Sequence, residues 1–169
     1  MKLTKTRKND DSGVSVLLEY IFLMTITAVL FSLFIIVLYS IFTNADQVII
    51  GDELGIVSND VAGRISGFSG GVYLNQYSDP AWNSNVPGST QTIDLPGLVS
   101  NNQYQVYIDY DPTTKSGIVT ASYKSSFTAN KTAGFRSDIS VVPVVLQSTN
   151  QKVNLYYDSP GNKIILEGA

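Results

Sequence analysis

The 169-residue chain contains no cysteine and no histidine. Without cysteine there is no disulfide framework, no thiolate nucleophile and no cysteine-based zinc site. Without histidine the chain lacks the usual general base and the commonest metal ligand, which excludes Ser-His-Asp hydrolases and histidine metal centres. The Ser-Lys nucleophile pair is also absent, since no Lys stands three residues after a Ser. The sequence therefore predicts a protein that is not an enzyme and that holds no cofactor.

Charge is scarce as well, and it is not basic overall. Only 15% of the residues are charged, with 11 Lys and Arg against 14 Asp and Glu, which gives a net charge of -3. A nucleic-acid-binding protein needs a surplus of basic residues to contact phosphates. The glycine-rich stretch 67–71 lacks the following Lys and helix of a phosphate-binding loop. We therefore expect no nucleic-acid partner and no small-molecule substrate.

One long apolar run lies near the N-terminus. Residues 20–42 form 23 consecutive positions without charge, proline or glycine. A helix of this length reaches roughly 34 Å, enough to cross a hydrocarbon core of about 30 Å. The alternative, a buried helix of a soluble protein, rarely stays apolar on every face for so long. The run predicts a transmembrane helix in contact with membrane lipid.

The flanks of this run predict its orientation. The residues before it include four basic ones, Lys2, Lys5, Arg7 and Lys8. Basic residues favour the cytoplasmic side, so we expect a single-pass protein with a cytoplasmic N-terminus and an extracellular C-terminal domain. A secretory signal has an apolar region of only about 7–15 residues and a small-x-small cleavage site after it. This run is longer and is followed by Thr-Asn-Ala-Asp, so we expect it to be retained and any cleavage to precede it.

The first part of this helix also carries a motif. Residues 11–30, DSGVSVLLEYIFLMTITAVL, resemble the N-terminus of archaeal type IV pilins and pilin-like proteins, which combine a short basic leader, a small residue, Val-Ser and a long apolar helix. The matching positions are Gly13, Val14, Ser15 and the run 23–27; the departures are Val16, where proline is usual, and Glu19, where glycine is common. A looser similarity, over 46–65, 95–97 and the strand at Tyr104, links the chain to archaeal pilin-like membrane proteins with an acidic helical stalk before a β domain.

The resemblance implies a class III signal peptide. A prepilin peptidase would cut near Gly13 and Val14 and leave the apolar helix as the new N-terminus. Glu19 would then be the sixth residue of the mature chain, whereas in bacterial relatives the comparable glutamate is the fifth and pairs with a neighbour's terminal amine. Glu19 is therefore a candidate assembly residue. A carboxylate near a helix N-terminus is also stabilised by the helix dipole at the lipid headgroups, and both interpretations stay open.

An amphipathic stripe follows the apolar run, with spacings of 4, 3, 4, 4 and 3 residues between its members. These are Ile50, Leu54, Val57, Val61, Ile65 and Phe68. The spacing predicts a stalk helix over 44–68, after a membrane or filament-core helix over 14–43, with its stripe packed against a globular domain. Gly51 and Gly55 predict a bend or break, and the glycine cluster at 67–71 predicts the helix end. We expect the carboxylates of Asp52, Glu53 and Asp60 to be solvated.

The remainder, residues 69–169, reads as strands. Apolar and aromatic residues alternate over 104–110, turn residues fill 111–117, and a partner strand follows at 118–124. The other expected elements are a hairpin of 152–158 and 163–167, weaker strands at 71–77, 90–95 and 140–146, and a loop over 79–89 with Trp82 as its anchor. The predicted fold class is α+β, a long N-terminal transmembrane and stalk helix followed by an antiparallel β-sheet or small β-sandwich. The leader is residues 1–13.

Three features of this domain bear on ligands. Asn130 begins an Asn-Lys-Thr sequon, a candidate N-glycosylation site if the domain is outside the cell. Asp109 and Asp111 resemble the start of a calcium loop, but no acidic residue closes it, so a hairpin turn is the better interpretation. Six tyrosines could form a partner- or carbohydrate-binding surface, although core and cross-strand packing explains them more simply: Tyr104, Tyr107, Tyr110, Tyr123, Tyr156 and Tyr157.

These features lead to one main functional hypothesis. It is a structural subunit or minor component of an archaeal type IV pilus-like surface filament or secretion pseudopilus, in which the helices over 14–42 pack side by side. Its partners would be membrane lipid, other pilin-like subunits and the prepilin peptidase. The alternative is a permanently membrane-anchored extracellular β domain that binds a surface-layer protein, a glycan or a stator partner.

Overall fold

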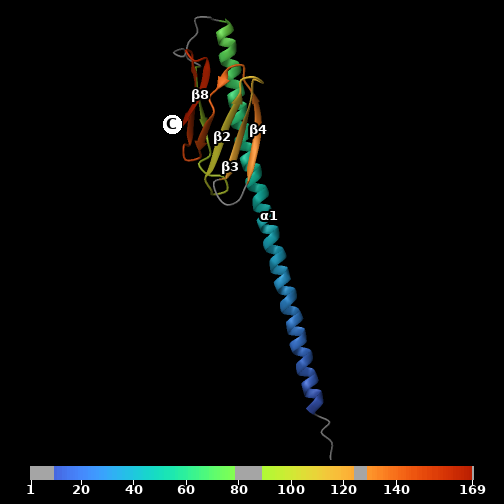
Figure 1. Cartoon of the computed structure of the whole chain (residues 1–169). Coiled ribbons are helices and arrows are strands. Elements are labelled where there is room, and N and C mark those ends of the chain that lie inside the picture. The colour runs from blue at the N-terminus through green and yellow to red at the C-terminus, as the bar shows by residue number, and fades with distance from the viewer. Residues whose placement is uncertain (1–9, 79–88, 124–128, 169) are drawn as a thin grey trace, which may run out of the picture. The chain divides into compact units, whose positions relative to one another are not determined.

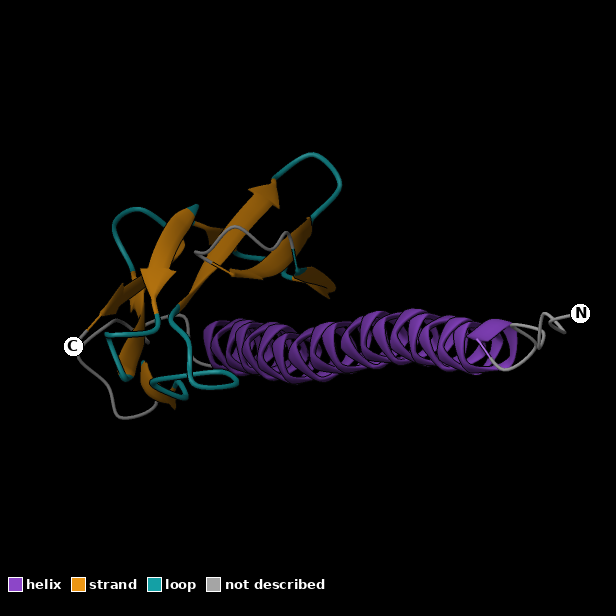
Figure 2. Cartoon of the chain, turned by 90° about the horizontal axis from the view of Figure 1, so that it is seen from below, coloured by secondary structure: helices purple, strands orange, loops and turns teal. Residues whose placement is uncertain are grey.

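The computed structural model describes residues 10–78, 89–123 and 129–168, and side chains from Gly13 onward. The chain divides into two compact units, Met1–Asp46 and Gln47–Ala169. Figures 1 and 2 show one long helix and a set of strands, which confirms the α+β fold class. The elements are α1 (Asp10–Ser78), β1 (Thr90–Asp94), β2 (Tyr104–Asp111), β3 (Ser116–Tyr123), β4 (Asn130–Arg136), β5 (Ser140–Val141), β6 (Val144–Gln147), β7 (Lys152–Asp158) and β8 (Lys163–Gly168).

The hydroxyl groups within the apolar part of α1 bond to the helix itself. Thr25, Thr27 and Ser32 each donate a hydrogen bond of 2.8 Å to the carbonyl oxygen four residues earlier. A hydroxyl satisfied in this way leaves no polar hydrogen without a partner in an apolar environment. These residues therefore fit a helix surrounded by lipid or by other helices.

In the second unit α1 differs from the prediction. The helix is not interrupted at Gly51 or Gly55, and it continues past the predicted end at residue 68 as far as Ser78, so the expected strand at 71–77 is wrong. Each glycine weakens a helix by about 1 kcal/mol relative to alanine. Packing outweighs this cost, because Val72 lies one turn beyond Phe68 and is buried in the same core.

The strands form two four-stranded sheets. The first sheet has the order β1-β7-β8-β5 and the second the order β4-β3-β2-β6; all neighbours are antiparallel except β5 and β8. Both predicted hairpins, β2–β3 and β7–β8, are confirmed. The strand expected at 90–95 is β1, whereas the one expected at 140–146 divides into β5 and β6, which belong to different sheets.

Two hairpin details explain local residue choices. The Asp111 carboxylate accepts hydrogen bonds from the Thr113 amide at 2.8 Å and the Thr114 hydroxyl at 2.9 Å, which holds the β2–β3 turn and lowers the pKa of Asp111. The turn interpretation of this acidic stretch is thus confirmed. Gly117, at the start of β3, has no room for a side chain: a Cβ there would lie 2.2 Å from the Phe135 ring and 2.5 Å from the Asp109 carbonyl oxygen.

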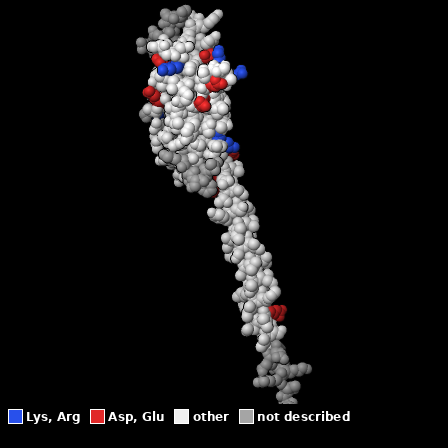
Figure 3. Space-filling view, in the orientation of Figure 1, with Lys and Arg blue, Asp and Glu red and all other residues white. Residues whose placement is uncertain are grey.

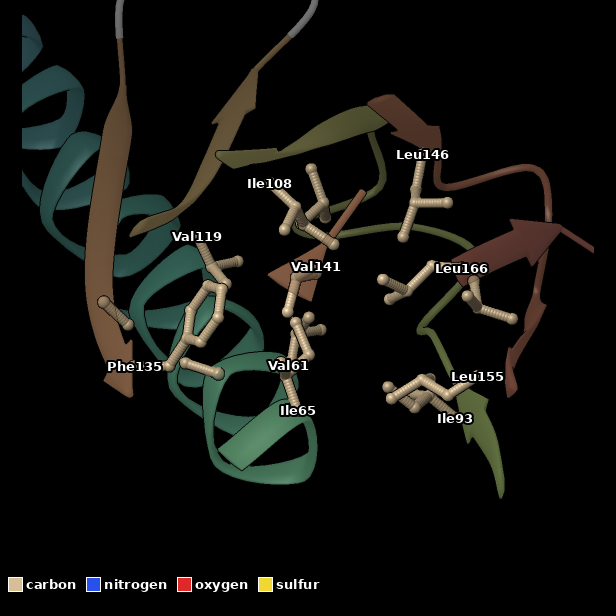
Figure 4. Packing of buried hydrophobic residues seen from close by; sticks show 14 of the residues in the cluster. Val61, Ile65, Ile93, Ile108, Val119, Phe135, Val141, Leu146, Leu155 and Leu166 are labelled. Atoms are coloured by element: carbon tan, nitrogen blue, oxygen red, sulfur yellow. The ribbon is translucent and has the colours of Figure 1, made fainter. Parts of the chain in front are cut away.

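Both sheets and the second part of α1 enclose one hydrophobic core. Figure 4 shows Val61 and Ile65 of the helix beside Val141, with Val119 and Phe135 of the second sheet on one side and Leu155 and Leu166 of the first sheet on the other. The predicted stripe faces this core: Leu54, Val57, Val61, Ile65 and Phe68 are buried, and Ile50 packs at its margin. The prediction that the stripe packs against the β domain is therefore confirmed.

The edge strand β4 lies along one flank of α1. The Ser66 hydroxyl donates to the Arg136 carbonyl oxygen at 3.1 Å and accepts from the Arg136 amide at 3.3 Å. The aliphatic stem of Lys131 packs over Gly51, where a Cβ would lie 3.2 Å from the lysine Cε. The absence of a side chain at Gly51 therefore leaves room for Lys131. Together these contacts hold β4, a strand that the sequence did not predict, against α1.

Candidate assembly surface

The N-terminal part of α1 presents apolar side chains on every face. Apart from Leu38, which is half-buried, the exposed fractions of its large hydrophobic residues within the first unit run from 47% for Ile26 to 71% for Tyr39. Glu19 is the one charged residue of the sequence between positions 13 and 45, and Figure 3 shows that the surface of the long helical segment carries almost no charge. Among the described residues, α1 is the one helix that is long and apolar enough to cross a membrane, and it is therefore a candidate membrane span.

Glu19 lies among apolar neighbours on the helix surface. A shallow depression there is lined by Ser15, Leu18, Glu19, Phe22, Leu23, Ile26 and Thr27. An ionised carboxylate that is covered by another apolar surface loses hydration, which costs several kcal/mol unless a cation or a hydrogen-bond donor compensates it. Glu19 therefore tolerates headgroups or a cationic partner, but not an uncompensated apolar contact. The candidate processing residues Gly13 and Val14 are exposed in the first turns of α1.

Within the second unit, α1 has an outward face opposite its buried stripe. Ile49 and Ile56 are exposed by 52% and 70%, although their neighbours Leu54 and Val57 are buried. Positions 49, 56, 63, 70 and 77 are spaced by seven residues and so share one face of the helix. They are Ile, Ile, Gly, Gly and Tyr, and no atom lies within 4 Å of a Cβ placed on either glycine.

A helix face with isoleucines and bare glycines is typical of surfaces against which another helix packs, because small residues allow close approach. We call the exposed residues Ile49, Ile56, Gly63 and Gly70 the outward face. The pattern of apolar residues predicted only the stripe that faces the core. The seven-residue spacing of the two isoleucines and two glycines was the signal that would have revealed the outward face.

The carboxylates on α1 in the second unit differ in their surroundings. Glu53 was expected to be solvated, but it is half-buried, and its Oε2 atom accepts hydrogen bonds of 2.8 Å from both the amide and the hydroxyl of Ser100. Ser100 and Asn101 have positive φ angles of 43° and 66°, so the carboxylate stabilises a tight left-handed turn before β2. Asp60 is exposed as predicted and forms an ion pair of 2.9 Å with Arg64.

The six tyrosines do not gather on one surface. Tyr104 and Tyr157 are buried in the core, whereas Tyr107 is exposed on the outer side of the second sheet, so the interpretation of a single tyrosine surface is wrong. Burial raises the pKa of Tyr104 to about 12, and its hydroxyl donates to the Pro96 carbonyl oxygen at 2.7 Å. Tyr110 stacks on Phe135 with ring centroids 6.2 Å apart.

Asn130 is the first residue of β4, and both it and Thr132 are exposed. The sequon is therefore accessible to a modifying enzyme. The charged groups of the leader and the predicted loop with Trp82 lie outside the described residues. Within those residues, no cluster of three or more Asp or Glu side chains is arranged to hold a metal ion.

Comparison of the chain with family models, curated proteins and solved structures found no match. What the chain's own surfaces define is a protein with a candidate membrane span and an α+β unit built around the end of the same helix. Its distinctive surface is the apolar helix with its outward face.

Proposed function

We propose that this chain is a structural, non-enzymatic subunit or minor component of an archaeal type IV pilus-like surface filament or secretion pseudopilus. The observation that carries the proposal is the position of exposed apolar residues on α1. They cover every face of the segment up to Asp46, and the second unit has exposed apolar residues of its own on its outward face. Neighbouring copies would bury these surfaces by packing their α1 helices side by side.

The outward face favours assembly over simple anchoring. A membrane anchor requires about 20 apolar residues, and residues 20–42 satisfy that need. Ile49 and Ile56 follow this run, in the unit that begins at Gln47. Burying a large aliphatic side chain completely lowers the free energy by roughly 1.5–3 kcal/mol. Two such side chains on one face therefore favour contact with another helix.

Glu19 and the processing site have linked roles in this proposal. Cleavage between Gly13 and Val14 would create a new amine at Val14, and the Glu19 carboxylate of a neighbouring copy is an anion that could pair with it. Such a pair would offset the cost of covering Glu19 with apolar helices. The leader would stay in the cytoplasm and the second unit would lie outside the cell, where Asn130 is open to glycosylation.

The decisive experiment is N-terminal mass spectrometry of the protein from the native membrane or filament fraction. We expect a chain that begins at Val14. Gly13→Phe should keep the leader attached and block assembly, whereas Gly71→Phe, a matched control on α1 outside the outward face, should be processed and assembled normally. If the native protein retains residues 1–13, the permanently anchored extracellular domain becomes the better description.

Topology can be tested separately. A tag after Ala169 should be accessible from outside intact cells and a tag at Met1 should not. The reverse pattern of accessibility would contradict both the filament proposal and the anchored-domain alternative.

A further inference from the structure

The outer side of the second sheet carries an exposed apolar patch. Among the described residues that follow α1, four large hydrophobic side chains are exposed, and three of them lie on this one side: Tyr107, Ile118 and Val145, with Leu98 as the fourth. Tyr107 of β2 is the direct cross-strand partner of Val145 in β6, and Ile118 of β3 is its diagonal neighbour. We call Tyr107, Ile118 and Val145 the outer patch.

The first and third residues of the Asn-Lys-Thr sequon point to the same side of the sheet. Between them, Lys131 lays its stem over Gly51 of α1, on the inner side of β4. Successive side chains of a strand point to opposite faces of a sheet, so Asn130 and Thr132 point away from the helix. Both are exposed. A sugar chain attached to Asn130 therefore begins on the side that carries the outer patch.

The cross-strand register brings the sequon close to this patch. Two adjacent rows of side chains cross the sheet here: the first is Asn130, Ser122, Gln105 and Gln147, and the second is Thr132, Thr120, Tyr107 and Val145. Neighbouring strands lie about 4.8 Å apart and two residues span about 6.8 Å of strand, which puts the Cα atoms of Asn130 and Tyr107 about 12 Å apart. A short chain of sugar rings covers this distance.

The side chain of Tyr107 leans toward the row that contains Asn130. Its hydroxyl donates a hydrogen bond of 2.6 Å to the side-chain oxygen of Gln105, and the Gln105 amide group donates to the side-chain oxygen of Gln147 at 3.1 Å. A tyrosine that bonds to a side chain two residues away on its own strand lies along the strand and leaves one face of its ring to solvent. The C–H groups of a sugar ring pack on such an apolar face.

The two rows offer hydrogen-bonding groups without charge. All eight of their residues are uncharged, and most carry a hydroxyl or an amide. These groups both donate and accept hydrogen bonds, as sugar hydroxyls do, whereas an acidic ligand would need a cation. The charged residues on this side of the sheet, Asp109, Asp111 and Arg136, lie beyond the second row, away from Asn130. A neutral sugar therefore matches this surface.

We propose that Asn130 carries a neutral sugar chain that folds back over the second sheet and covers the outer patch, with one ring stacked on Tyr107. The inference rests on one part of the proposed function, the extracellular position of the second unit. The chain's own glycan is the occupant, because its attachment beside the patch keeps it at a high effective concentration there. Covering the patch also removes apolar surface from water.

The transfer step needs a sugar donor, a sugar chain linked to a lipid phosphate. The Nδ2 atom of Asn130 forms a bond to the anomeric carbon of the first sugar, and the bond from that carbon to the phosphate oxygen breaks. The lipid phosphate leaves with the bonding electron pair, and the amide gives up one proton to the transferase.

Mass spectrometry of peptides from the native membrane fraction tests the modification. The peptide that contains Asn130 should carry the added mass of a sugar chain. Thr132→Ala should remove this mass, whereas the matched control Thr132→Ser, which keeps the sequon, should retain it. A bare Asn130 in a chain whose C-terminal tag is accessible from outside the cell would overturn the inference and leave the filament proposal standing. A chain that retains residues 1–13 and carries the sugar would support the inference and contradict the filament proposal.

Hydroxyl-radical labelling of the full chain, as dilute monomers in detergent micelles, tests where the sugar chain lies. Labelling of the outer patch should be severalfold slower in the glycosylated parent than in Thr132→Ala. Tyr77, which is exposed on α1, should be labelled equally in both and serves as the internal control. Equal labelling of the outer patch in the two proteins would overturn the proposal. Protection that appears only at high protein concentration would identify a neighbouring copy as the source of the cover and overturn the choice of the chain's own glycan.

A variant of the aromatic ring separates stacking from attachment. Tyr107→Ala should leave Asn130 modified but raise the labelling of Ile118 and Val145 to the rate seen in Thr132→Ala. Leu98→Ala, which shortens an exposed side chain outside the outer patch, should keep the protection. Both residues are exposed, so both variants should keep the circular dichroism of the parent. Unchanged protection in Tyr107→Ala, or equal loss in the two variants, would overturn the role of the ring.

Discussion

Two isoleucines of α1 provide the sharpest test of which face of this helix is buried in the core and which is exposed. Ile65 has an exposed fraction of 0% and Ile56 one of 70%, although both belong to the same helix. Ile65→Ala removes three carbon atoms from the core. At about 0.8 kcal/mol for each buried methylene equivalent, the transfer term is about 2.4 kcal/mol, and the remaining cavity raises the total to about 3–4 kcal/mol.

Ile56→Ala should leave the free energy of unfolding within about 0.5 kcal/mol of the parent, because an exposed side chain loses no core contacts and alanine favours the helix slightly more than isoleucine. The same substitution should instead lower the yield of assembled filaments, if the outward face joins copies. Stability and assembly would then respond to different residues of one helix.

The assay is urea unfolding of the full chain in mild detergent, followed by the near-ultraviolet circular dichroism of the tyrosines. A small domain loses about 1–3 kcal/mol of stability per molar urea, so Ile65→Ala should lower the unfolding midpoint by about 1–4 M. Ile56→Ala should leave the midpoint nearly unchanged. Equal shifts for the two variants would refute the assignment of the buried and outward faces.

Three further predictions concern the second unit. Gly117→Ala places a methyl group against a ring and a carbonyl oxygen, so it should lower the free energy of unfolding by about 2–3 kcal/mol in the same urea assay; an unchanged midpoint would show that β3 can shift to make room. Because burial raises the pKa of Tyr104 to about 12 from its ordinary 10.0, its contribution to stability is complete below pH 10 and is lost as the pH rises to 12; the parent should therefore lose up to about 3 kcal/mol more than Tyr104→Phe over that interval, and parallel pH profiles would contradict this. Glu53→Ala should cost about 1–2 kcal/mol and speed amide exchange at Ser100, while its exposed neighbour variant Asp52→Ala should do neither; equal effects would show that the carboxylate does not hold the turn.

Two strong signals in the sequence, an apolar run and an amphipathic stripe, were sufficient to predict the helical part of the fold. The uninterrupted apolar run predicted a helix that could span a membrane, and the stripe from Ile50 to Phe68 predicted a second helical segment with one face on a β domain. Both signals are local, because the spacing of apolar residues along one helix determines which of them share a face. The alternation at 104–110 and the turn residues after it identified the β2–β3 hairpin for the same reason.

Other features depended on contacts between residues far apart in the chain. Nothing local indicates that α1 passes through Gly67, Gly70 and Gly71, since the helix persists there because Val72 joins a core built from both sheets. The strand β4 has only two buried residues, Ala133 and Phe135, and is held by pairing with β3 and by Ser66 of α1. The intrinsic preference of a residue for helix or strand is worth about 1 kcal/mol or less. The burial of a side chain or the pairing of a strand edge outweighs this preference. Local spacing therefore predicted the elements whose apolar residues recur regularly along the chain. The end of the helix, the edge strands and the exposed face of α1 depend instead on contacts between residues that are distant in the sequence.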